Sequence, residues 1–118
     1  MFRKEVERLV KLGVLEEANE SEWGTPYFPH PKPKTNHVRF LSDFWNLNRQ
    51  LKRKPYPMPK ICELLLNVEG FKYATSLNLN MGYYNMRLSD QASSLCGIIL
   101  PWGKYKYKHL PMGICNSP

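Results

Sequence analysis

Alternating prolines place the strongest limit on how this 118-residue chain can fold. Proline occupies every second position of residues 29–33 and again of residues 55–59. Because proline has no backbone N–H group and a fixed φ, it cannot donate to a sheet ladder or continue the interior of a helix. The first group therefore predicts an edge or irregular strand, and the second predicts that residues 49–59 are extended.

The apolar pattern around these prolines predicts an α+β fold with antiparallel strands and a few helices. Gly13 follows the first apolar helical face and provides a C-terminal stop. The predicted helices cover residues 3–12 and 59–68. The predicted strands cover residues 27–28, 38–41, 71–79, 84–88, 95–100 and 104–110. The segments predicted to connect these elements are residues 16–24, 34–37 and 89–94.

The strand at residues 104–110 shows the clearest alternation. Tyr105 and Tyr107 alternate with Lys104, Lys106 and Lys108. Since successive side chains of a strand point to opposite faces, one face is aromatic and the other basic. The lysines could reach a phosphate backbone, but a solvated strand face is the favoured interpretation.

The three cysteines, Cys62, Cys96 and Cys115, are odd in number and widely spaced. They support neither a disulfide framework nor a zinc site, so we expect reduced, largely buried thiols in a reducing compartment. The apolar runs are too short to span a bilayer, and charges within residues 1–15 interrupt any signal peptide. These features predict an intracellular protein without a membrane partner.

The net charge of +7 is concentrated in one stretch, residues 32–54. That stretch contains seven basic residues and one acidic residue, Asp43, which gives 7 − 1 = +6. Its basic residues are Lys32, Lys34, Arg39, Arg49, Lys52, Arg53 and Lys54. A concentrated basic patch favours nucleic-acid phosphates as the ligand, with an ordinary solvated surface as the alternative.

Five short motifs follow one another from Val6 to Pro118. They are V-E-R-L-V-K-L-G-V-L-E with S-E-W-G-T-P (6–16 and 21–26), the basic segment 32–48, K-P-Y-P-M-P-K-I (54–61), L-N-L-N-M-G-Y (77–83), and W-G-x-Y with L-P-M-G-I-C-N-S-P (102–105 and 110–118). In this order and spacing they resemble the reverse transcriptases of gypsy-type long-terminal-repeat retrotransposons. Each motif alone is weak, and their order makes the resemblance specific.

The resemblance implies the fingers and the first half of the palm of a right-hand polymerase. Residues 1–24 would form a helix and connection, residues 25–70 the fingers, and residues 71–118 part of the palm. The family transfers nucleotides from deoxynucleoside triphosphates onto a primer, directed by an RNA or DNA template. Two metal ions, usually Mg²⁺, are held by carboxylates in this reaction.

The resemblance also assigns roles to individual residues. Arg39 matches the arginine that grips the incoming triphosphate, and Lys32 or Lys34 matches the phosphate-binding lysine. Tyr83 matches the residue beneath the nucleotide sugar, where a ring leaves no room for a 2′-hydroxyl. Met112 and Gly113 match the loop that seats template and nucleotide. The residues expected to contact nucleic-acid phosphates are Lys34, Arg49, Lys52, Arg53 and Lys54. The residues expected to act in turns or caps are Asp43, Asn48 and Asn116.

The sequence departs from the family motifs at positions that bear on catalysis. Asn78 stands where the family has its first metal-binding aspartate, and Trp45 stands where it usually has arginine. The only aspartates are Asp43 and Asp90, and they are not adjacent. We expect the family's Y-x-D-D motif, with the other catalytic aspartates, to lie beyond Pro118. The chain alone is therefore predicted to be inactive and to bind no metal productively.

Four functional hypotheses follow. The leading one is an inactive fragment of an RNA-directed DNA polymerase. The second is a small basic nucleic-acid-binding protein that uses the basic patch of residues 32–54, which lies in the expected fingers. The third is a generic basic α+β protein, and the fourth is a polymerase completed by another chain, against which Asn78 argues. Unpaired palm strand edges also predict poor solubility or self-association.

Overall fold

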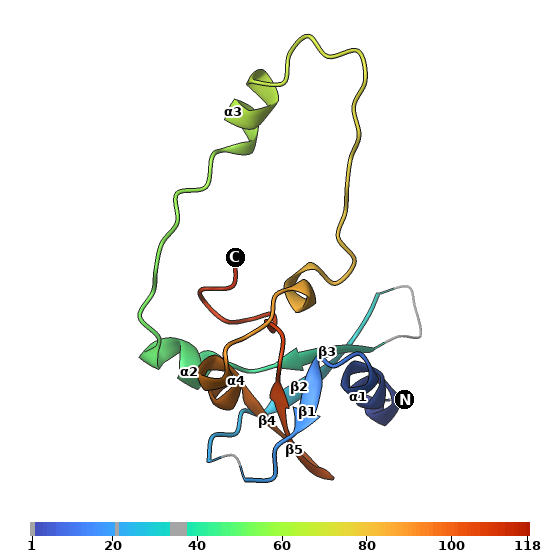
Figure 1. Ribbon diagram of the computed structural model, residues 1–118, viewed down its shortest axis with the longest axis vertical. Helices are drawn as coiled ribbons and strands as arrows, with labels where there is room; N and C mark the ends of the chain where they lie inside the picture. Colours follow the sequence, from blue (N-terminus) through green and yellow to red (C-terminus); the bar gives the residue numbers. More distant parts are fainter. Residues whose placement is uncertain (1, 21, 34–37) are drawn as a thin grey trace.

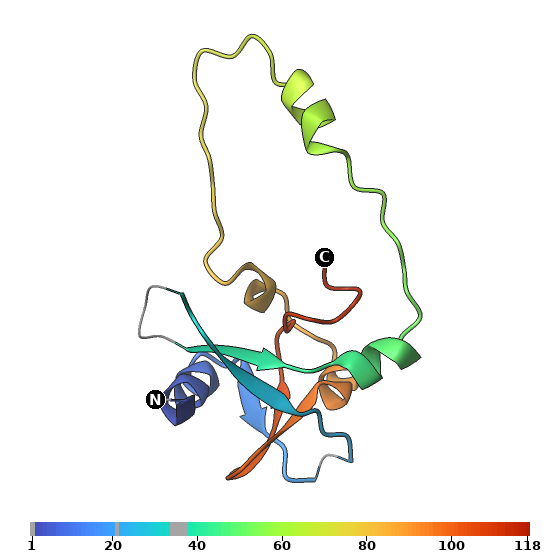
Figure 2. The same ribbon diagram turned by 180° about the vertical axis from the view of Figure 1, so that it is seen from behind.

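Two antiparallel sheets and a helix enclose the core of the computed structural model, which describes residues 2–20, 22–33 and 38–118 (Figures 1 and 2). The elements are α1 (Phe2–Lys11), β1 (Leu15–Glu17), β2 (Tyr27–Pro31), β3 (Val38–Ser42), α2 (Trp45–Gln50), α3 (Ile61–Leu66), the 3₁₀ helix η1 (Gly82–Asn85), α4 (Asp90–Leu95), β4 (Gly97–Leu100) and β5 (Gly103–Tyr107). One sheet has the order β1-β5-β4, and the other is the hairpin β2-β3. The predicted α+β class with antiparallel strands is confirmed.

Strand β5 lies at the centre of the three-stranded sheet. Its register places Tyr107 opposite Leu15 on β1 and Tyr105 opposite Ile98 on β4. Both tyrosines are buried, as the alternation predicted. On the other face, the carboxylate of Glu16 lies 3.2 Å from Nζ of Lys108.

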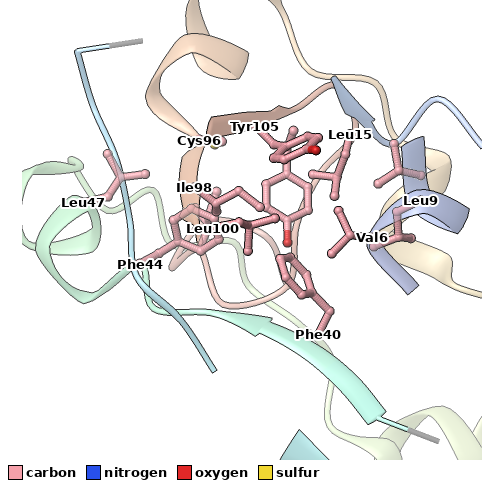
Figure 3. Packing of buried hydrophobic residues seen from close by; sticks show 13 residues of the cluster. Val6, Leu9, Leu15, Phe40, Phe44, Leu47, Cys96, Ile98, Leu100 and Tyr105 are labelled. Carbon is pink, nitrogen blue, oxygen red and sulfur yellow. The ribbon is translucent and has the colours of Figure 1, made fainter. Parts of the chain in front are cut away.

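The core gathers side chains from both sheets and from α1 (Figure 3). Helix α1 contributes Val6 and Leu9, and it ends before Gly13, whose φ of +74° suits a residue without a side chain. Tyr107 lies at the centre, with its ring centroid 6.0 Å from that of Phe44. The hydroxyl groups of Tyr107 and Ser42 lie 3.0 Å apart, which satisfies the buried phenol.

The hairpin has the edge strand that its prolines predicted. Among the described residues, β2 pairs in a ladder only with β3, and His30 lies opposite Arg39. The predicted turn at 34–37 lies outside the described residues. Thr25 joins the hairpin to the other sheet, because its N–H group donates to Gly97 and its carbonyl accepts from Ile99.

Residues 52–80 leave the body of the molecule in a wide arc that carries α3 (Figures 1 and 2). Every residue of this arc, which we name the excursion, is exposed. Residues 52–59 form neither helix nor strand, as the prolines predicted, but residues 49 and 50 of the segment predicted to be extended belong to α2. The strand predicted at 71–79 is wrong, because no neighbouring strand offers it a hydrogen-bonded ladder in the described part of the chain.

Other predicted elements also need correction. Strand β1 and helices α2 and α4 were not predicted, and residues 84–88 form the end of η1 and one bridge between Arg87 and His109 instead of a strand. Helix α4 replaces a predicted connection, because Ser89 caps it by accepting from the Ala92 N–H group. Cys96 is buried as predicted, whereas Cys62 is exposed. No helix among the described residues has the length and apolar character needed to cross a membrane.

Candidate nucleotide and nucleic-acid site

An open cavity of about 690 Å³ lies where α1, the hairpin, η1 and the loop after β5 meet. The residues that line it are Glu5, Arg8, Leu9, Lys32, Phe40, Asn80, Met81, Gly82, Tyr83, Tyr84 and Met112. Three of them, Lys32, Tyr83 and Met112, were predicted to contact a nucleotide. They come from three separate segments of the sequence, so folding brings them to one place.

A tight turn presents Tyr83 to the cavity. Met81 adopts a left-handed conformation with φ of +53° and directly precedes η1. The side-chain amide of Asn85 donates to the carbonyl of Asn80 at 3.3 Å, which holds the two ends of the turn together. The backbone of this segment is therefore fixed locally, although the excursion before it has no buried residue.

The cavity also contains an ion pair that the sequence analysis missed. Arg8 donates from Nη2 and Nε to the two carboxylate oxygens of Glu5, at 2.7 and 3.0 Å. These hydrogen bonds raise the pKa of Arg8, so its charge is fixed. The spacing i, i+3 on a helix was the available signal, but the sequence did not show that this face borders a cavity.

Tyr84 is half-buried, whereas its neighbour Tyr83 is exposed. Burial raises the pKa of Tyr84, so its phenol stays neutral. Its ring stacks 6.4 Å from the Tyr107 ring, which connects the cavity wall to the core. The phenol of Tyr84 is thus a neutral group in the wall of the cavity.

Other residues that were predicted to contact the nucleotide or its phosphates are not among the residues that line the cavity. Arg39 pairs with His30 across the hairpin, and its side chain lies outside the described part of the structure. Lys34 also lies outside the described residues. Gly113 follows Met112 with φ of +100°, but it is absent from the cavity lining. Its role, like that of Arg39, stays a prediction.

The predicted nucleic-acid contacts Arg49, Lys52, Arg53 and Lys54 form an exposed strip, which we name the basic strip. Asn116 holds part of it in place. Its Nδ2 donates to the Lys52 carbonyl at 3.2 Å, and its Oδ1 accepts from the Lys54 N–H group at 3.1 Å. Asn116 therefore joins two distant segments, where the sequence predicted a helix cap.

Asn48 also differs from its predicted turn or cap role. It lies within α2, and its side chain bonds to the backbone of Gly113 and Cys115. Asp43 has the expected turn role, because its carboxylate accepts from the Trp45 N–H group at 3.0 Å.

Asn78, at the position of the family's first catalytic aspartate, is exposed in the excursion and does not line the cavity. Within the described ranges, no group of three or more His, Cys, Asp or Glu side chains is arranged to hold a metal ion. The described residues therefore do not supply the carboxylate cluster that two-metal catalysis requires.

Comparisons with known proteins show a similar sequence and fold over nearly the whole chain. No protein-family model matches the sequence. The native protease–reverse transcriptase of prototype foamy virus shares 27% identity and a TM-score of 0.79, over 96% of this chain and 15% of that chain. The Pol polyprotein of the gypsy transposon of Drosophila melanogaster is 30% identical over 122 residues, which cover 96% of this chain and 11% of that protein.

Over nearly its whole length the chain is similar to the reverse-transcriptase part of gypsy-type and retroviral Pol polyproteins. The predicted resemblance is thereby confirmed. The chain spans between 11% and 19% of the length of the first three curated relatives that it matches. A further foamy viral structure, solved with an RNA/DNA hybrid, has the same fold, with a TM-score of 0.82 at 24% identity.

Proposed function

We propose that this reverse-transcriptase segment binds a deoxynucleoside triphosphate in the cavity and a template–primer along the basic strip. In this proposal residues 25–70 correspond to the fingers and residues 71–118 to part of the palm. The convergence of Lys32, Tyr83 and Met112 on one cavity is the observation that carries it.

The cavity offers the two kinds of contact that a nucleotide needs. Lys32 supplies an ammonium group for phosphate oxygens, and the Arg8 charge is largely balanced by Glu5. Tyr83 and Met112 supply apolar surface for the sugar and base. The Tyr83 ring also disfavours a ribonucleotide, since the added 2′-hydroxyl would need the space that the ring occupies.

Nucleic-acid binding is supported by the exposed positions of Arg49, Lys52, Arg53 and Lys54. No carboxylate lies between Asp43 and Glu63 to neutralise them. Such a strip should release counterions on binding, so affinity should fall steeply with salt. The RNA/DNA hybrid in the foamy viral structure supports the same class of partner for this chain.

Polymerisation by these 118 residues alone is not expected. The family uses Mg²⁺, and Asn78 offers a neutral amide in place of a carboxylate. Asp43 is engaged with the Trp45 N–H group, and Asp90 begins α4 on another part of the fold. The proposed activity is therefore ligand binding, with chemistry dependent on carboxylates that this sequence does not contain.

Calorimetric titration with a deoxynucleoside triphosphate in excess Mg²⁺ tests the cavity. We expect Lys32→Ala to weaken binding about tenfold, which corresponds to about 1.4 kcal/mol for one charged hydrogen bond. Lys72→Ala is the matched control, because it removes the same charge from the excursion, outside the cavity. Equal loss in both variants would show that net charge alone, and not the cavity, binds the nucleotide.

Primer extension on an RNA template with Mg²⁺ tests the expected inactivity. The chain and its Asn78→Asp variant should both be silent, beside an intact relative that extends the primer. Nucleotide incorporation by the unaltered chain would contradict the proposal. Incorporation by Asn78→Asp would also contradict the proposal, because it would mean that other carboxylates of this chain complete the metal site.

A further inference from the structure

Trp45 is a large apolar side chain that remains in contact with solvent. Its side chain is 60% exposed, whereas Phe44 and Leu47 on either side are 2% and 4% exposed. The two buried neighbours anchor α2 to the core, so the indole projects from a fixed helix. An exposed aromatic ring on a fixed support is suited to stacking against a planar ligand.

The indole is held by a second side chain. The guanidinium carbon of Arg49 lies 4.7 Å from the centroid of the Trp45 ring, four residues further along α2. This cation–π contact orders both groups, so less conformational entropy is lost when a ligand binds. The pair joins an aromatic surface to a positive charge.

The surroundings of the pair determine the chemistry of its partner. The chain continues from α2 into the exposed residues Lys52, Arg53 and Lys54, whose backbone is tied to Asn116. A ligand here must therefore combine a regular series of negative charges with planar apolar groups. Single-stranded nucleic acid has both, whereas the bases of a duplex are already stacked on one another.

We propose that Trp45, ordered by Arg49, stacks on an unpaired base of single-stranded nucleic acid whose phosphates lie along Lys52–Lys54. The proposal deepens the proposed nucleic-acid binding and rests on it. It adds a contact to the base, which phosphate binding alone does not include. Stacking is indifferent to base identity, so this contact selects single strands without selecting a sequence.

Fluorescence anisotropy with a labelled single strand of about 12 nucleotides tests the stacking contact. Trp45→Ala should weaken binding by about tenfold, while Trp45→Phe, which keeps a ring, should retain most of the affinity. Tyr73→Ala is the matched control, because Tyr73 is an exposed aromatic side chain in the excursion, and it should leave affinity unchanged. Equal affinity of Trp45→Ala and the unaltered chain would overturn the proposal.

Salt dependence separates stacking from charge. Trp45→Ala should lower affinity at every salt concentration without changing the slope of log K against log salt. Arg53→Ala should reduce that slope by about 0.7, the value for one phosphate contact on a single strand. A reduced slope in Trp45→Ala would mean that the substitution displaces the basic strip, which would overturn a direct base contact.

An abasic strand of the same length tests the unaltered chain without any substitution, and so does not depend on variants that fold. Loss of the bases should weaken binding of the unaltered chain by about tenfold. In Trp45→Ala the abasic strand should bind no more weakly than it binds the unaltered chain. Undiminished binding of the abasic strand, or equally tight binding of a duplex, would overturn the stacking contact alone. Absence of binding to any strand would overturn the proposed nucleic-acid function as well.

Discussion

The side-chain Nδ2 of Asn48 donates a 2.8 Å hydrogen bond to the carbonyl oxygen of Gly113, which lies 65 residues later in the chain. The Oδ1 atom of the same amide accepts from the Cys115 N–H group at 2.9 Å. One side chain thus satisfies two backbone groups of the loop after β5 and ties that loop to α2. Because Met112 of this loop lines the cavity, Asn48 couples the position of the cavity wall to that of the basic strip.

Asn48→Asp should destabilise the chain by about 1–3 kcal/mol, because a carboxylate cannot donate to Gly113 and places two acceptors against each other. Urea unfolding measures the difference. Asn46→Asp is the control, since it adds the same charge to an exposed position of the same helix. Equal midpoints for the two variants would show that the Asn48 bonds contribute no stability.

The features that were predicted correctly are those whose sequence pattern lies within a single short segment of the chain. Tyr105 and Tyr107 alternate with lysines, and one register alone buries both rings. Gly13 ends α1 through its own backbone freedom. The family motifs likewise identified Lys32, Tyr83 and Met112, which the fold brings to one cavity.

The remaining features depend on contacts between distant segments. Strand β1 is only three residues long and exists because Leu15 and its neighbours pair with β5. Residues 71–79 have the composition of a strand but no partner, so they remain extended and exposed. The roles of Asn48 and Asn116 could not be predicted, because nothing in either local sequence identifies the segment to which each binds.

Tyr107→Phe should lower stability by about 1–2 kcal/mol, because it removes the hydrogen bonds of a buried phenol while preserving the ring. The partners lost are the Ser42 hydroxyl, 3.0 Å from the phenol oxygen, and the phenol of Tyr84. A double-mutant cycle with Ser42→Ala, measured by urea unfolding, isolates the pair of Ser42 and Tyr107. The losses in the free energy of unfolding should be less than additive in the double variant, since either substitution removes the same bond. Strict additivity would show that the bond between Ser42 and Tyr107 contributes no stability.

Stability should fall at alkaline pH through Cys96. Burial raises the pKa of this thiol to about 11 from 9.0. Between these values the unfolded chain releases the proton and the folded chain keeps it, so the free energy of unfolding falls as pH rises. The two-unit window corresponds to a loss of about 2–3 kcal/mol.

Urea unfolding between pH 8 and about 11 measures this loss. Cys96→Ala should be less stable at pH 8, because it leaves a cavity, yet should lose less stability on going to high pH. Cys62→Ala is the control, because Cys62 is exposed. If Cys96→Ala and Cys62→Ala show the same change of stability with pH, the buried thiol does not control the alkaline loss. The phenols of the half-buried Tyr84 and the buried Tyr107, whose pKa values are also raised, are present in both variants.

Self-association should occur through the apolar side chains of the excursion. Leu65 on α3 is 68% exposed, and Ile61 and Leu66 beside it are also exposed, so pairing two copies would remove a large apolar surface from water. Sedimentation velocity over a concentration series should show oligomers of the unaltered chain and a shift towards monomer in Leu65→Glu.

Leu12→Glu is the matched control, because Leu12 is 56% exposed on the body of the molecule. A chain that stays monomeric at every concentration would contradict self-association, and an equal shift in both variants would place the contact outside the excursion.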